Sequence, residues 1–253
     1  MGVLTESQRA QYERDGYLLT SGLIPEDVAE RAEAAMWRIM GMAPGEPETW
    51  HRKPEGVAGF QAERGLSVFN GLRDRDLMAC ATPHYLKATA ELIGEDDVHP
   101  PEAVHTQNKV PVNGAWSLPR AHVDGIPREH MHETFPGPYR IASLVFLSDV
   151  KHKGGGTAVF PGSHRKILAL AESDREKYKY LFDLNRDIPR LDLGDPIELT
   201  PKRGDVLFFT YLFGHNGTAN VGGSPRWMMR YFCSCQGCQT RWKKTEDWGL
   251  WSP

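Results

Sequence analysis

A histidine and a carboxylate stand two residues apart in the stretch PRAHVDGIP, which covers residues 119–127. In an extended chain, residues i and i+2 point to the same face, so His122 and Asp124 present an imidazole and a carboxylate side by side. Such a pair can bind a metal ion, but a catalytic ion needs a further protein ligand. The alternative is an ordinary contact between His and Asp in a surface turn, and the rest of the sequence has to decide between the two interpretations.

A third candidate ligand is His215, in the stretch TYLFGHNGTAN. Two histidines and one carboxylate on one side of an octahedral metal leave the opposite side open, which is the ligand set of non-haem Fe(II) oxygenases. A competing pair, His130 and His132, lies in REHMHET between two prolines. It lacks the acidic residue that should follow several positions later, and the prolines indicate a loop. We interpret this segment as a cover over the substrate rather than as a metal site.

Four segments resemble the phytanoyl-CoA dioxygenase-like branch of the Fe(II)/2-oxoglutarate-dependent oxygenases, and the resemblance covers nearly the whole chain. YERDGYLLTSGLIPEDV at 12–28 is similar to the N-terminal segment of that family, and AHVDG at 121–125 is similar to its first metal motif. GGGTAVFPGSH at 154–164 resembles the loop and strand that follow. RGDVLFFTYLFGHNGTANVGGSPRW at 203–227 resembles the block that carries the distal histidine, an asparagine and a later arginine. Their order and spacing make the resemblance specific.

The resemblance implies a double-stranded β-helix, a cupin-like jelly roll that holds iron at its mouth. It implies Fe(II) bound by His122, Asp124 and His215, with 2-oxoglutarate as cosubstrate and O2 as oxidant. It also implies that Arg226, eleven residues after His215, binds the distal carboxylate of 2-oxoglutarate. A planar and permanently charged guanidinium can hold a carboxylate through two hydrogen bonds. Arg230 faces the same side of the strand and is the alternative anchor, unless it forms an ion pair at the base of the barrel.

Three more residues are candidates for contacts with the cosubstrate. Gln107 and Lys109 share one face of a predicted strand with His105, just upstream of the His-x-Asp pair. In the related enzymes this strand contacts cosubstrate or substrate, and the alternative is a solvated strand face. Thr157, in a Gly-Gly-Thr turn, could donate its hydroxyl to 2-oxoglutarate or cap the turn. Asn220 is expected to shape the loop after the distal histidine.

The activity that the resemblance implies is hydroxylation of an unactivated C–H bond in a small-molecule metabolite, with succinate and CO2 as co-products. Halogenases of this class have Gly or Ala where this chain has Asp124, so the carboxylate favours hydroxylation, while desaturation and ring rearrangement use the same centre. Two alternatives belong to other classes: a metal protein of the same fold with hydrolase or isomerase chemistry, and a binding protein that has lost catalysis. Arg226 argues against both, because neither needs to anchor a diacid.

The elements that position these residues change character along the chain. Helices are expected at 5–21 (ending in an apolar turn at 17–19), 25–41 and 73–94, with an extended loop at 43–65. From about residue 98 short β-branched and aromatic runs alternate with Gly and Pro turns, interrupted by a helix at 164–182 that Ser163 caps. Strands are expected at 103–112, 140–147, 157–160, 197–200, 206–213 and 227–235.

These elements predict a mostly β fold with supporting helices. We expect one oxygenase domain over residues 1–253, with 1–97 as helical support and 98–253 as a jelly-roll core that carries an insert at 164–195. Of the four cysteines, Cys233, Cys235 and Cys238 form C-x-C-x2-C. The cluster lacks the partner ligands of a zinc site, and we interpret it as reduced thiols at the end of a strand.

Composition narrows the class of protein. The chain has 253 residues, of which 40% are hydrophobic and 25% charged, as in ordinary globular proteins. Its net charge of -3 argues against a nucleic-acid partner, which usually requires a basic excess. It shows neither a signal-peptide pattern nor an apolar run as long as a membrane span, so we expect a cytoplasmic protein without membrane contact. The expected partner is a small molecule. Basic residues around the metal strands are compatible with a charged one.

Overall fold

The computed structural model describes residues 2–94, 98–124, 133–135, 140–232 and 234–235. Most strands belong to two antiparallel sheets. The large sheet contains β1 (Tyr17–Thr20), β2 (Gly59–Gln61), β3 (Leu66–Leu72), β5 (Val104–Lys109), β6 (Ile141–Phe146), β9 (Val206–Thr210) and β11 (Met228–Phe232). The small sheet contains β7 (Thr157–Val159), β8 (Ile197–Glu198) and β10 (His215–Gly217), while β4 (Val98–His99) pairs with β12 (Ser234–Cys235).

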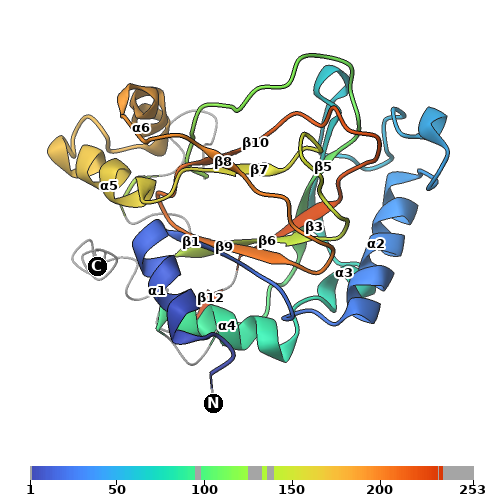
Figure 1. Cartoon of the computed structure of the whole chain (residues 1–253), viewed down its shortest axis with the longest axis horizontal. Coiled ribbons are helices and arrows are strands. Elements are labelled where there is room, and N and C mark those ends of the chain that lie inside the picture. Colours follow the sequence, from blue (N-terminus) through green and yellow to red (C-terminus); the bar gives the residue numbers. More distant parts are fainter. Residues whose placement is uncertain (1, 95–97, 125–132, 136–139, 233, 236–253) are drawn as a thin grey trace.

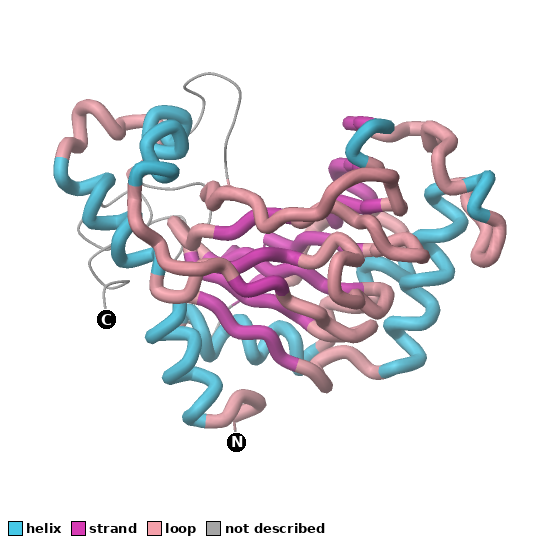
Figure 2. Tube along the Cα trace, turned by 45° about the horizontal axis from the view of Figure 1, so that its top comes forward, coloured by secondary structure: helices cyan, strands magenta, loops and turns pink. Residues whose placement is uncertain are grey.

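The strand orders are β1-β9-β6-β11-β5-β3-β2 and β10-β7-β8, so most neighbours in space are distant in sequence. Helices pack around the two sheets, with α1, α2 and α4 against the large sheet and α5 and α6 beside the small one (Figure 1, Figure 2). They are α1 (Glu6–Asp15), α2 (Glu26–Met40), α3 (Arg75–Met78), α4 (Pro83–Ile93), α5 (Ser163–Ser173) and α6 (Leu181–Asp187), with 3₁₀ turns η1 (Pro47–Thr49), η2 (Ala62–Arg64) and η3 (Ile188–Arg190). Two facing antiparallel sheets confirm the predicted jelly-roll class.

The first core lies between the large sheet and the N-terminal helices. Trp227, Met229 and Tyr231 point from β11 and its approach toward these helices, as their alternation with the two arginines predicts. The ring of Trp227 meets that of Trp37 on α2 edge to face at 4.7 Å, and the Tyr231 hydroxyl donates to the backbone carbonyl of Leu77. This packing holds β11 in place and leaves its other face for the site.

The second core fills the space between the two sheets and extends to α5 and α6. Phe209 and Leu144 from the large sheet meet Val159 from the small sheet, and Leu181 and Leu184 close the core from α6. Residues of β6 and β9 are buried at every position, since helices cover one face of these strands and the small sheet covers the other. In the described ranges, no helix has the length and apolar character needed to cross a bilayer.

The N-terminal third, predicted as helical support, also contributes three strands to the large sheet. The apolar segment expected as a turn at 17–19 is strand β1, which pairs with β9, and β2 and β3 also join the large sheet. A four-residue strand gives no periodicity to detect, so its pairing partner decides its conformation. The helix predicted at 73–94 is two helices, because Thr82 accepts a capping bond from the N–H of Tyr85 and Pro83 starts a new helix.

The helix predicted at 164–182 is also two helices, and Ser163 is not its cap. Gly162, at φ 73°, precedes α5, and Ser163 is the first helical residue. The Ser163 hydroxyl instead accepts the N–H of Gly214 at 2.9 Å. The serine therefore ties α5 to the residue before His215 rather than to its own helix.

The turn after α1 offers a test of the packing between α1 and α5. Gly16 ends α1 at φ 80°, and a Cβ at this position would overlap the ring of His164. We expect Gly16→Ala to lower the free energy of unfolding by about 2–5 kcal/mol, the sum of a left-handed alanine and an overpacked contact. Gly22 has the same φ, but a Cβ there would have no atom within 4 Å. Gly22→Ala should therefore lower the free energy of unfolding by only about 1–2 kcal/mol. Urea unfolding of both variants measures the difference, and equal losses would contradict the His164 contact.

Candidate metal centre

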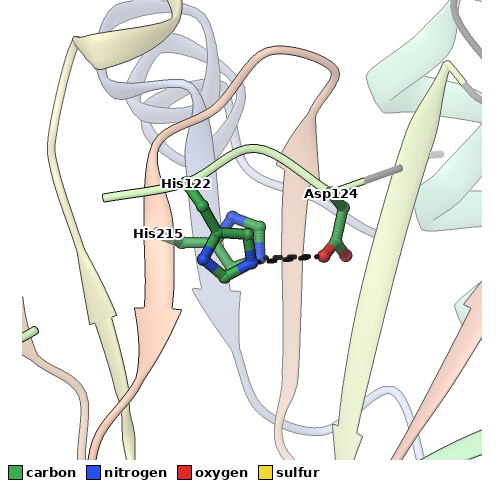
Figure 3. A group of neighbouring side chains, drawn as sticks. All are labelled: His122, Asp124 and His215. Atoms are coloured by element: carbon green, nitrogen blue, oxygen red, sulfur yellow. Dashed lines mark ion pairs between the residues drawn. The ribbon is translucent and has the colours of Figure 1, made fainter. Parts of the chain in front are cut away.

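The His-x-Asp segment is held beside β10. The N–H of His122 donates to the carbonyl of His215 and the N–H of His215 donates to the carbonyl of His122, each at 3.0 Å. The side chain of Val123, between the two candidate ligands, is buried in the second core. His122 and Asp124 therefore face the site together, as their spacing predicts, and both rings approach the carboxylate in Figure 3.

The three side chains offer donors to one ion. The Nε2 atoms of His122 and His215 each lie 3.6 Å from Oδ1 of Asp124, and the three donor atoms lie within 4.8 Å of one another. Nδ1 of His215 lies 3.0 Å from the carbonyl of Phe213. A ring whose Nδ1 donates to a carbonyl keeps its Nε2 lone pair for a metal. Two nitrogens and one oxygen suit Fe(II), so the residues present fit this ion.

The protonation states also suit a metal ion, because ligands must be neutral imidazoles and an ionised carboxylate. Burial, together with the nearby His215 and Arg230, lowers the pKa of His122 against the opposing effect of Asp124. Burial alone would raise the pKa of Asp124, but Arg230 and the two histidines bring it well below its usual value. At neutral pH the site therefore presents a carboxylate beside an uncharged His122.

Arg230 accounts for the second oxygen of Asp124. Its Nη1 donates to Oδ2 at 2.7 Å from strand β11, so an ion pair joins the large sheet to the His-x-Asp segment. Arg230 does form an ion pair, but its partner is the candidate ligand Asp124 and not a residue at the base of the barrel as predicted. With Oδ2 engaged, Oδ1 is the oxygen turned toward both histidines.

The three candidate metal ligands and the four predicted cosubstrate contacts line one cavity of about 190 Å³. They are His122, Asp124, His215, Arg226, Gln107, Lys109 and Thr157. Arg64, Leu66, Leu144, Asn216, Gly217 and Met228 complete its lining. The sequence analysis did not single out Arg64, Leu66 or Asn216. Arg64 and Leu66 follow a segment without a periodic pattern, and Asn216 stands next to His215 on β10.

Arg226 is buried against the backbone at the C-terminal end of β5. Its Nε donates to the carbonyl of Gly155 at 2.9 Å and its Nη1 to that of Gln107 at 2.6 Å. These bonds use two of the five N–H donors of a guanidinium and fix its plane, leaving donors for a ligand. Burial lowers the pKa of Arg226 to about 9, so the group keeps its charge at neutral pH. The cavity thus contains a fixed, partly desolvated cation.

Lys109 lies beside Arg226, since the two residues pair through their backbones. Its Nζ donates to the carbonyl of Thr218. Burial, and then repulsion from Arg226 and Arg64, lowers the pKa of Lys109 to about 7. An anion bound in the cavity would favour the charged form of this amine.

Of the remaining sequence-based candidates, some have a defined position and others lie outside the described residues. Thr157 is the first residue of β7, which confirms the strand predicted from residue 157, and it is buried. The Asn220 side chain shapes its loop as expected, since it donates to the carbonyls of Lys109 and Ser224 and accepts the N–H of Gly222. His130, His132, Cys233 and Cys238, and the side chain of Cys235, lie outside what the structure describes.

Solved structures of similar fold include non-haem enzymes that use α-ketoglutarate. The carbocyclase SnoK from nogalamycin biosynthesis matches with a TM-score of 0.63 at 17% identity, over 92% of this chain and 85% of that one. EctD from S. alaskensis, solved with 2-oxoglutarate and 5-hydroxyectoine, matches with a TM-score of 0.63 at 16% identity, over 92% of this chain and 77% of that one. At these identities the likeness supports the jelly-roll fold.

Sequence comparisons identify the family to which the chain is similar. The model of the family "Phytanoyl-CoA dioxygenase (PhyH)" matches residues 12–228. The ectoine dioxygenase of Bordetella parapertussis is 24% identical over 241 residues, 88% of this chain and 73% of that protein. The probable phytanoyl-CoA dioxygenase of Caenorhabditis elegans is 24% identical over 238 residues, 86% of this chain and 71% of that protein.

The jelly roll, the His-Asp-His donor set and these relatives together define a non-haem dioxygenase that depends on Fe(II) and 2-oxoglutarate. Within that class, the chain belongs to the phytanoyl-CoA dioxygenase family.

Proposed function

We propose that this enzyme hydroxylates an unactivated C–H bond of a small-molecule metabolite, working as one domain over residues 1–253, with succinate and CO2 as co-products. The observation that carries the proposal is the single cavity that contains the metal-type donor set together with Arg226 and Lys109. A hydrolase of the same fold would use the three ligands but has no need for the buried guanidinium of Arg226 and the amine of Lys109 beside them.

His122, Asp124 and His215 would hold Fe(II). Bound there, the metal would supply the oxidation of 2-oxoglutarate by O2 that is coupled to oxidation of the substrate. Arg226 would bind the distal carboxylate of 2-oxoglutarate with the donors that its two backbone bonds leave, and Lys109, Gln107 and Thr157 would surround the same molecule. The chain's own part is to orient the carboxylates, exclude water and present one C–H bond.

Asp124 favours hydroxylation over halogenation. A carboxylate occupies the position at which halogenases of this class have a small residue. Solved relatives in fold include a carbocyclase and an epimerase, SnoK and SnoN from nogalamycin biosynthesis, so product analysis has to separate hydroxylation from these chemistries. We also propose a cytoplasmic enzyme, as the sequence predicts.

The test needs no substrate. Fe(II) is added to the metal-free protein under argon, 2-oxoglutarate is titrated in, and the visible spectrum is followed. We expect a weak charge-transfer band that saturates with 2-oxoglutarate, followed by succinate formation when air is admitted. Bound Fe(II) without such a band would assign the three ligands to other chemistry and overturn the proposal.

A further inference from the structure

A side chain from a helix distant in sequence binds the backbone between the proposed ligands His122 and Asp124. Asn185, on α6, accepts the N–H of Val123 through Oδ1 at 2.9 Å and donates through Nδ2 to the Val123 carbonyl at 3.3 Å. One carboxamide therefore satisfies both backbone groups of the residue between His122 and Asp124. A neighbouring β-strand would make the same two bonds.

This side-chain clamp lies on the edge of the His-x-Asp segment that no strand among the described residues pairs with. On one edge, the backbone of His122 pairs with that of His215. Alternate residues of an extended chain direct their backbone groups to opposite edges, so Val123 turns its N–H and carbonyl away from β10 and toward α6. Within the described residues, Val123 is met on that edge by Asn185 rather than by a strand.

The clamp itself is fixed by its helix. Nδ2 of Asn185 also donates to the carbonyl of Leu181 at 3.1 Å, one turn back on α6. Leu181 and Leu184 are fully buried in the second core, which prevents the helix from sliding. Both polar atoms of the carboxamide are thus engaged, and they join α6 to the backbone of Val123.

We infer that Asn185 is a positioning residue of the metal centre, one that is not among the residues lining the cavity and that sets the spacing of His122 and Asp124 through the Val123 backbone. The inference rests on the proposed function, in which these two residues hold Fe(II). It also gives the insert at 164–195 a role in the chemistry, since α6 belongs to that insert.

The experiment measures metal binding directly, with Co(II) as the probe and the metal-free full-length protein as the receptor. We expect Asn185→Ala to weaken Co(II) binding by about 10–100-fold, the range typical when a partner that orients a metal ligand is lost. Arg186→Ala is the matched control on the same helix, because Arg186 is exposed and pairs with Asp183. Its Co(II) affinity should equal that of the wild type.

The Asn185→Asp variant distinguishes loss of the two Val123 hydrogen bonds from a purely electrostatic effect on Co(II) binding. Aspartate keeps the shape and accepts the Val123 N–H, but it cannot donate to the Val123 carbonyl and faces that oxygen with a negative charge. An added negative charge alone would strengthen cation binding, whereas a broken clamp weakens it. We expect weaker Co(II) binding, and this isosteric variant decides the matter if Asn185→Ala does not fold.

A second readout excludes a general loss of structure. At saturating Fe(II), the dissociation constant for 2-oxoglutarate, read from the charge-transfer band, should stay within about twofold, because Asn185 has no contact with Arg226 or Lys109 in the described structure. Wild-type Co(II) affinity in both Asn185 variants would overturn the inference. Absence of Co(II) binding by the wild type would instead refute the proposed metal centre.

Discussion

The Asp124→Ala protein is expected to bind Fe(II) weakly and to form no detectable succinate from 2-oxoglutarate. Removal of the carboxylate takes away the oxygen that faces both histidines and frees Arg230 from its Oδ2 partner, which places a guanidinium beside the metal site. Loss of an outer-shell partner already costs about 10–100-fold in affinity or activity, so loss of a proposed ligand should cost more. Anaerobic Fe(II) titration and succinate assays measure the two effects.

Asp205→Ala supplies the matched control. Asp205 is also a buried aspartate, but it accepts the N–H of Lys202 in the turn before β9 and does not line the cavity. This variant should lose stability and keep its Fe(II) affinity. Succinate formation by Asp124→Ala within about tenfold of the wild-type rate would remove Asp124 from the proposed ligand set, since losing one outer-shell partner alone can cost that much.

The Arg226→Lys protein is expected to bind 2-oxoglutarate about 100-fold more weakly than the wild type. Lysine keeps a charge but loses the planar fork, and a charge-assisted hydrogen bond is worth about 1.5–3 kcal/mol. The same protein should bind 2-oxopentanoate, which lacks the distal carboxylate, as the wild type does. Titration of the charge-transfer band with both acids isolates the contribution of that carboxylate.

Arg230→Lys provides the comparison, because Arg230 lies four residues further along the same strand face. The ion pair with Asp124 predicts that this change alters Fe(II) affinity and leaves the preference for 2-oxoglutarate over 2-oxopentanoate intact. If Arg230→Lys lost that preference and Arg226→Lys kept it, our assignment of the carboxylate anchor would be wrong.

The parts of the site that could be predicted from the sequence are those that local geometry controls. His122 and Asp124 share a face because strand side chains alternate, and the same rule separates Arg226 from Trp227. The resemblance of separate motifs to those of the family then implied His215 as the third metal ligand. The structure adds that these residues line one cavity, which spacing alone could not establish.

The parts that could not be predicted depend on contacts between distant segments. Asn185 lies 62 residues from Val123, and an asparagine on a helix carries no local signal for binding another backbone. The partner of Arg230 is equally non-local, since Asp124 lies 106 residues away. Strand β1 was missed for the same reason, because its conformation comes from β9 and not from its own four residues.

The pairing of β1 with β9 has a consequence for how the protein folds. Tyr17 lies opposite Phe209, so an edge strand made early in synthesis has no partner until most of the chain exists. Loop closure over such a separation costs entropy before the pairing returns any stabilisation, and folds dominated by distant pairings fold slowly. The strand His215–Gly217 is made later still. During synthesis the proposed metal centre can therefore form only after His215 has been made, and a chain that ended earlier would lack one of its three proposed ligands.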